Sequence, residues 1–168
     1  KMNCTIGLLG GGQLGQMLCE AANSLGLKVI ILDNGLSPAK QINAKVSHIN
    51  GSFSDPDRIR ELASRVDILT VETEHVDTFT LEDIAEMGVV KKSKDEKLSI
   101  SKVKVQPSWR TIRTIQDKYL QKQHLISHGI QTVLARPIAP TPVDLEAFGQ
   151  KFGFPFVLKS RKNAYDGR

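Results

Sequence analysis

The sequence predicts a doubly wound α/β domain with a parallel sheet, followed by the beginning of a second domain. Over roughly the first 105 residues, short apolar runs of strand length alternate with amphipathic segments of helix length. A glycine-rich turn joins the first strand to the first helix, and the alternation gives way to a longer helical pattern from Thr111 onward. We therefore expect one domain over residues 1–107 and the incomplete start of another over residues 108–168.

The first predicted strand, Ile6 to Leu9, runs into glycines 10, 12 and 15, which have the spacing G-x-G-x-x-G. The helix that follows is expected to place on one face Leu14, Met17, Leu18, Ala21, Ala22 and Leu25. A helix that starts at such a turn presents free backbone N–H groups and a positive dipole end to an anion. We therefore expect a phosphorylated ligand to approach the backbone here. A turn needed only for packing is the alternative.

The next segments continue the alternation of strands and helices. Strands are expected at 28–32, 46–49, 66–71 and 103–105, with helices that begin at Pro38, after Ser54 or Asp55, and near Thr78. Asp33 follows the second strand, where a dinucleotide-binding domain places an acid that holds a ribose. An NAD-binding dehydrogenase domain is therefore one alternative, although Asp33-Asn34-Gly35 is also an ordinary turn sequence.

The predicted strand 66–71 ends in Glu72-Thr73-Glu74-His75. The carboxyl ends of strands carry ligand groups in doubly wound sheets, and Glu72 and Glu74 point to the same side if the strand continues. We expect at least one of these side chains to contact a ligand. Capping of the helix near Thr78 is the alternative, and no second cluster supports a metal site.

The net charge is +5, and six of the lysines lie in residues 91–104. This segment lacks the interleaved arginines and aromatic residues of a nucleic-acid interface, so we interpret it as a solvated, mobile connection and expect no nucleic-acid partner. No apolar run is long enough for a membrane span, and the early strand leaves no room for a signal peptide. We expect a cytoplasmic protein with Cys4 and Cys19 reduced.

The second domain is expected to begin with one amphipathic helix from Thr111 to Gly129. A strand at 130–134, a proline-rich connection, a helix at 144–152 and a strand at 154–159 complete the pattern. Lys159 ends an apolar strand, where a lysine can serve a phosphate as a point charge.

Five blocks of sequence, in this order, closely resemble the 5-(carboxyamino)imidazole ribonucleotide synthase family of ATP-grasp enzymes. They are GGGQLG at 10–15, VETEHV at 71–76, IQDKY with QK at 115–122, FPFVLKS at 154–160 and AYDGR at 164–168. These motifs are most similar to those of the fungal form of the family, in which this module is fused to a carboxyaminoimidazole ribonucleotide mutase. The resemblance covers nearly the whole chain, and it implies a Rossmann-like pre-ATP-grasp domain followed by the beginning of an ATP-grasp domain.

The resemblance also implies a function in de novo purine biosynthesis: carboxylation of 5-aminoimidazole ribonucleotide with ATP and bicarbonate. It assigns the ribonucleotide to Gly12, Gln13, Leu14, Glu72 and His75. It assigns ATP to Lys118, Lys159, Tyr165, Asp166, Gly167 and Arg168, with Lys159 and Arg168 catalytic.

The ligands for Mg²⁺ are expected beyond Arg168 in this family. We therefore expect the 168-residue portion alone to be inactive, and the complete enzyme to be a homo-oligomer. A non-catalytic fragment that still binds the ribonucleotide is the remaining alternative.

Overall fold

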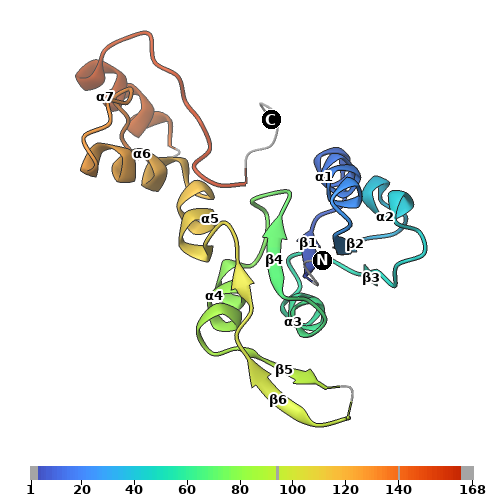
Figure 1. The fold of residues 1–168 in the computed structure, drawn as a ribbon. Helices are drawn as coiled ribbons and strands as arrows, with labels where there is room; N and C mark the ends of the chain where they lie inside the picture. Colours follow the sequence, from blue (N-terminus) through green and yellow to red (C-terminus); the bar gives the residue numbers. More distant parts are fainter. Residues whose placement is uncertain (1–3, 94, 140, 164–168) are drawn as a thin grey trace. The chain divides into compact units, whose positions relative to one another are not determined.

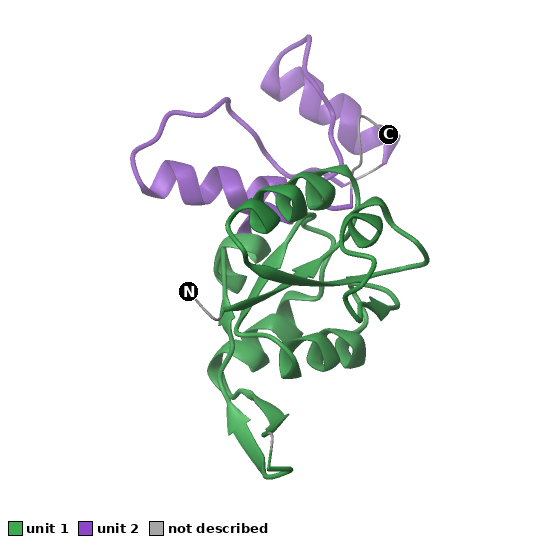
Figure 2. Ribbon diagram, turned by 45° about the vertical axis from the view of Figure 1, so that its right-hand side comes forward, with its two compact units in different colours: residues 1–113 green, residues 114–168 purple. Residues whose placement is uncertain are grey.

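The computed structural model describes residues 4–93, 95–139 and 141–163. The chain divides into two compact units, residues 1–113 and residues 114–168 (Figure 2). The domain boundary expected after residue 107 stays a prediction.

The first unit is built on a five-stranded parallel sheet (Figure 1). Its strands are β1 (Thr5–Leu9), β2 (Lys28–Asp33), β3 (Ile49–Asn50), β4 (Ile68–Val71) and β7 (Lys104–Val105). Their order is β3-β2-β1-β4-β7, so the chain first adds strands on one side of β1 and then on the other. This is the predicted doubly wound topology. The third strand is shorter than expected, and β7 is an edge strand as predicted.

Helices cover both faces of this sheet, because residues along each strand alternate between two cores. The helices are α1 (Gln13–Ser24), α2 (Pro38–Ile42), α3 (Pro56–Ser64) and α4 (Thr78–Glu86). One core joins Leu8, Val29 and Ile31 to Cys19, Ala22 and Ala39 of α1 and α2. The other joins Leu9, Ile30 and Leu32 to Ile59, Leu62, Leu81 and Ile84 of α3 and α4.

The buried face of α1 differs from the predicted one. Leu14, Met17 and Leu25 are 64%, 58% and 74% exposed, whereas the buried residues are Gly15, Cys19 and Ala22. The glycine turn fixes the rotation of the helix, because a Cβ on Gly15 would lie 3.1 Å from Leu8 Cδ2. Small residues therefore face the sheet and bring the helix close to it.

An aspartate caps the N-terminus of each of the helices α3 and α4, which pack on the other face of the sheet. Asp55 accepts from Asp57 N at 2.9 Å, with Pro56 in the first turn, as the sequence predicted. Asp77 caps α4 in the same way and accepts from Phe79 N at 3.1 Å. The capping role considered for Glu74 and His75 therefore belongs to Asp77.

The lysine-rich segment is not the irregular connection that we expected. Two antiparallel strands, β5 (Val89–Lys92) and β6 (Leu98–Ser101), form a hairpin in which Val90 pairs with Ile100. Apolar residues alternate with serines along β6, which reads Leu-Ser-Ile-Ser, whereas β5 reads Val-Val-Lys-Lys. The pairing places Val90 beside Ile100, so these two apolar residues share one face of the hairpin. The lysine count concealed this pattern.

The helices α5 (Trp109–Ile115), α6 (Lys118–Ser127) and α7 (Pro142–Phe152) complete the chain. The single helix expected from Thr111 to Gly129 is interrupted because Asp117 caps α6 and starts it anew. The strands expected at 130–134 and 154–159 are also absent from the described residues. A strand persists only where a neighbour completes its hydrogen bonds, and the described part of this unit offers none.

Candidate functional site

The glycine turn and Glu72 meet where the winding of the sheet reverses. The turn follows β1 and Glu72 follows β4, and these two strands are neighbours. Ligands of open α/β sheets bind outside the carboxyl ends of the strands at such a switch point. The topology therefore places the glycine turn and Glu72 at the edge of the sheet where ligands of such folds bind.

Glu72 is joined directly to the glycine turn. Its Oε2 accepts a hydrogen bond from Gly12 N at 2.6 Å, and its own N–H donates to Leu9 O at 2.9 Å. A Cβ on Gly12 would lie 2.5 Å from Glu72 Oε1, and one on Gly10 would lie 2.9 Å from Oε2. We expected these glycines to make room for a ligand phosphate. The structure shows that they make room for the protein's own carboxylate.

A second carboxylate closes the other side of the turn. Asp33 Oδ2 accepts from Gly11 N at 2.9 Å, and the Gly11 carbonyl accepts from Ala39 N at 2.9 Å. Lys40 is buried and donates to the carbonyls of Asp33 and Gly35, and its burial lowers the pKa of its ammonium. Asp33 is thus engaged within the protein, which disfavours the alternative that it holds a dinucleotide ribose.

Open hydrogen-bonding groups remain at the start of α1. Gly12 is the N-cap residue, and no side chain caps this helix. Within the described residues, no acceptor bonds the N–H groups of Gln13 or Leu14, and no donor bonds Glu72 Oε1. The site therefore offers two donors with a positive dipole end and one carboxylate oxygen that can accept.

His75 lies on the loop after β4 rather than on the strand. The strand ends at Val71, so the condition under which Glu72 and Glu74 share a side is not met. Glu72 bonds to the glycine turn, whereas Glu74 Oε1 lies 3.7 Å from His75 Nε2. His75 is half-buried, and within the described parts of the chain it makes no hydrogen bond or ion pair with Gly12 or Glu72.

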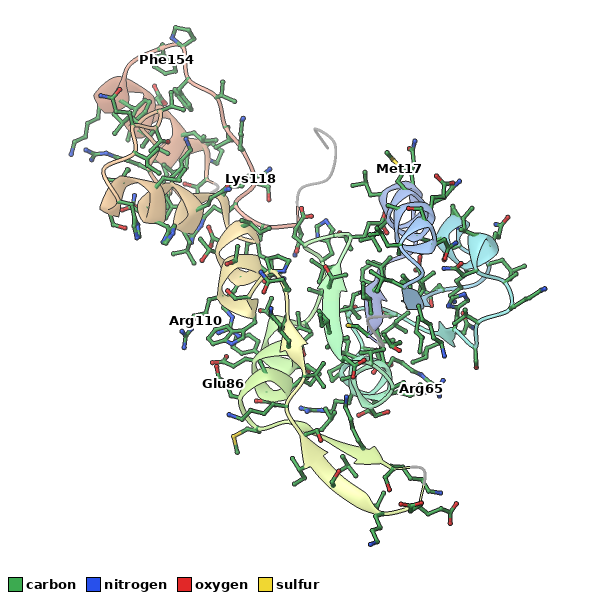
Figure 3. All side chains as sticks on the ribbon, in the orientation of Figure 1. Met17, Arg65, Glu86, Arg110, Lys118 and Phe154 are labelled. Carbon is green, nitrogen blue, oxygen red and sulfur yellow. The ribbon has the colours of Figure 1, made fainter. Side chains whose placement is uncertain are left out.

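The predicted ATP residues belong to the second unit. Lys118 is the first residue of α6 (Figure 3), and both Lys118 and Lys159 are exposed. Asp117, which precedes Lys118, is bound by Arg161 through Nη2 to Oδ2 at 2.6 Å and Nε to Oδ1 at 3.2 Å. Tyr165, Asp166, Gly167 and Arg168 lie outside the described residues.

The described residues contain no group of three or more His, Cys, Asp or Glu side chains arranged to hold a metal ion. We therefore assign no magnesium ligand among these residues. None of the helices in this part of the chain is both long and apolar enough to cross a membrane.

Two structural features of these regions were not found from the sequence. The Asp117–Arg161 pair joins residues 44 positions apart, which no local pattern reveals, although Asp before a helical run is itself a capping signal. Asp33 was considered as a ribose ligand or as part of an ordinary turn, but not as an acceptor for Gly11 N. Its spacing after the glycine turn suits the ribose role and the observed one equally.

Comparisons with known proteins identify the family of this chain. The family model described as "Ribonucleotide synthetase preATP-grasp domain" matches residues 2–116. Phosphoribosylaminoimidazole carboxylase of Ogataea methanolica is 49% identical over 98% of this chain, which spans 28% of that relative.

Two solved structures from Aspergillus clavatus are also similar. The carboxyaminoimidazole ribonucleotide synthase complexed with ATP is 45% identical with a TM-score of 0.86, over 99% of this chain and 40% of that one. The N5-carboxyaminoimidazole synthase in complex with ADP and 5-aminoimidazole ribonucleotide is 44% identical with a TM-score of 0.78, over 91% and 37%. The chain thus spans less than half the length of each of these relatives.

Proposed function

The chain belongs to the family of ribonucleotide synthetase pre-ATP-grasp domains, and from this premise we propose that it is the N-terminal portion of a purine-biosynthetic enzyme. The proposed reaction is the carboxylation of 5-aminoimidazole ribonucleotide at the expense of ATP, with bicarbonate as the source of the carboxyl group. One observation carries this proposal: the Glu72 carboxylate is fixed by Gly12 N beside the open N-terminus of α1.

The two kinds of group at this site suit a ribonucleotide. The N–H groups of Gln13 and Leu14 can bind its oxygen atoms, with the dipole of α1 favouring negative charge. Glu72 Oε1 can accept from a hydroxyl or amino group of the same ligand. Because Oε2 is held at 2.6 Å by Gly12 N, the direction of Oε1 is set before the ligand arrives.

The ATP half of the reaction is assigned to the second unit. Phosphoryl transfer from ATP to bicarbonate would release ADP and form carboxyphosphate. The substrate amine would then attack the carboxyl carbon and release phosphate. Lys118 and Lys159 supply positive charge for the phosphates, which is the main requirement of such chemistry. The proposal also includes ATP contacts by Tyr165, Asp166, Gly167 and Arg168, with Arg168 as a catalytic residue.

A kinetic assay of the complete protein that contains this sequence tests the proposal. We expect ADP release that requires both 5-aminoimidazole ribonucleotide and bicarbonate. Glu72→Gln removes the charge but keeps the shape, so we expect the KM for the ribonucleotide to rise about tenfold or more, because a charge-assisted hydrogen bond is lost. The KM for ATP should change less than twofold.

Glu86→Gln is the matched control, because Glu86 is an exposed carboxylate on α4 (Figure 3). It should leave both KM values unchanged. ADP release that does not depend on the ribonucleotide would refute the proposed substrate. Inactivity of residues 1–168 alone, a homo-oligomeric complete enzyme and a cytoplasmic location remain predictions.

A further inference from the structure

The buried carboxylate of Asp117 makes hydrogen bonds to two separate segments of the second unit, the start of α6 and the segment that contains Arg161. Asp117 is 1% exposed, and its Oδ1 accepts from Tyr119 N at 2.9 Å and Leu120 N at 3.2 Å. Arg161 binds both carboxylate oxygens from the other segment. A further bond joins Lys118 N to Arg161 O at 2.9 Å. The start of α6 is therefore tied to Arg161 through both side chain and backbone.

This arrangement exceeds what capping of α6 requires. An N-cap side chain needs only to accept from the first free N–H groups of the helix. A guanidinium that meets a carboxylate through two N–H groups also fixes the direction of approach, which a single hydrogen bond does not. Arg161 lies over the Tyr119 ring as well, with Cζ 5.3 Å from the ring centroid.

In the sequence, the two members of the pair flank the lysines assigned to ATP. Lys118 directly follows Asp117, and Lys159 precedes Arg161 by two residues. With the bond between Lys118 N and Arg161 O in place, the chain geometry keeps the Cα atoms of Lys118 and Lys159 within about 15 Å of each other. Two lysine side chains at this separation can reach the same phosphate group.

We propose that the Asp117–Arg161 pair is a positioning device that holds Lys118 and Lys159 for joint binding of the ATP phosphates. This inference rests on the proposed function, since it takes both lysines as ATP ligands. Neither Asp117 nor Arg161 is assigned a contact with ATP. Their effect passes through the backbone that carries the lysines.

Arg161 has a second effect, which is electrostatic. The guanidinium holds the pKa of Asp117 below its usual range, so the carboxylate stays charged at neutral pH. Paired with Arg161, this charge is balanced within the pair. Without Arg161, a buried carboxylate next to Lys118 would compete with ATP for the lysine ammonium groups. Loss of Arg161 should therefore harm ATP binding more than loss of the Asp117 charge.

The test compares Arg161→Gln, Asp117→Asn and the double variant in the complete protein. The readouts are equilibrium binding of a fluorescent ATP analogue and the KM values for ATP and ribonucleotide. We expect ATP affinity to fall about thirtyfold in R161Q and about fivefold in D117N, because asparagine still caps the helix. The double variant should match D117N rather than the product of the two effects. The ribonucleotide KM should change less than twofold.

Two further variants control for folding and for charge. Arg161→Lys keeps the positive charge but cannot donate to both carboxylate oxygens as the guanidinium does. Its ATP affinity should therefore lie between those of R161Q and the wild type. Arg136→Gln removes an exposed arginine of the same unit and should change nothing. A merely structural pair would lower the melting temperature and the active fraction while leaving ATP affinity unchanged, and that result overturns the inference.

The outcomes separate this inference from the proposed function. Unchanged ATP affinity in R161Q, or additive effects in the double variant, refutes the positioning role alone. A wild-type protein that binds ATP but does not carboxylate the ribonucleotide refutes the function, and the binding series still tests the pair. A wild-type protein that does not bind ATP refutes both.

Discussion

Gly12 has a φ of −72°, which any residue can adopt, so its identity is explained by the space around it rather than by its backbone. An alanine Cβ there would lie 2.5 Å from Glu72 Oε1. We expect Gly12→Ala to displace Glu72, to break its bond to Gly12 N, and to cost about 1–3 kcal/mol in the free energy of unfolding. Urea unfolding of the 168-residue chain, followed by the fluorescence of Trp109, measures this.

The control for this prediction removes the clash instead of the glycine. In the double variant Gly12→Ala/Glu72→Ala, the side chain that blocks the new methyl group is gone. Stability should therefore recover toward that of Glu72→Ala alone. If the double variant is as unstable as the sum of the two single changes, the crowding between Gly12 and Glu72 is not what requires glycine.

Asp117 provides a prediction about pH. The hydrogen bond from Arg161 lowers the pKa of Asp117 in the folded state. Its stabilising effect is therefore complete above the unfolded value of about 3.9 and is lost as the pH falls through the lower folded value. Protection of the Tyr119 and Leu120 amides against hydrogen exchange should fall over that range, since both amides donate to Asp117.

NMR hydrogen exchange between pH 2 and pH 6, expressed as protection factors, measures this effect. Asp117→Asn is the comparison: its side-chain amide still caps the helix but cannot ionise, so the protection of Tyr119 and Leu120 should be independent of pH. The amides of Phe79 and Thr80 at the cap of α4 provide an internal reference, because among the described residues no arginine donates to their acceptor, the Asp77 carboxylate. If Tyr119 and Phe79 lose protection at the same pH, Arg161 does not lower the pKa of Asp117.

At the scale of elements, the sequence predicted strands and helices where local signals agree. The apolar runs of β1, β2 and β4 and the Asp55-Pro56 start of α3 were all identified. The orientation of α1 was not, because the glycine turn decides which side faces the sheet, and Leu14 and Met17 suggested another side. The β5–β6 hairpin was missed because its lysine content outweighed the alternation in β6.

Gly88 ends α4 and leads into β5, and this connection gives a prediction at the same scale. Its φ is +89°, and a Cβ there would lie 2.9 Å from backbone atoms of Ser101 in β6. Gly88→Ala therefore combines backbone strain with a clash against the hairpin. We expect it to cost about 2–4 kcal/mol in the free energy of unfolding. Urea unfolding followed by Trp109 fluorescence measures this in the first unit.

Gly26→Ala is the matched control, because Gly26 has a φ of +67° and nothing lies within 4 Å of the added Cβ. This change should cost only the backbone strain, about 1–2 kcal/mol. The difference between the two variants isolates the contact between Gly88 and β6. Equal losses would show that the hairpin does not pack against Gly88 in solution.

At the scale of the whole molecule, the two units differ in how far the sequence predicted them. In the first, the doubly wound parallel sheet was predicted from the alternation of strands and helices, and the candidate site from the glycine turn and the end of the strand expected at 66–71. In the second, the strands expected at 130–134 and 154–159 depend on partners that are not among the described residues, and local pattern cannot supply them. Candidate site residues could be proposed from the sequence where they belong to a recognisable motif. The contact between Arg161 and Asp117 became visible only in the folded structure.

The extent of the first domain provides the last prediction. Ile112 is fully buried in the core that contains Leu81, Ile84 and Val105, and Arg113 donates to Thr78 O at 3.0 Å and to Glu82 Oε2 at 2.8 Å. Removal of Ile112 from such a core costs about 2–5 kcal/mol. A chain of residues 1–107 should therefore be less stable than a chain of residues 1–116 by at least that amount.

Urea unfolding followed by far-ultraviolet circular dichroism compares the two chains, since the shorter one lacks Trp109. Ile112→Ala in the longer chain is the control, and it should lose part of the same stability without changing the chain length. Equal stability of the two chains would mean that residues 108–116 add nothing to the first domain and that it ends at residue 107, as the sequence predicts. A clear difference would extend the domain through α5, because the side chains of Ile112 and Arg113 complete its core and its surface.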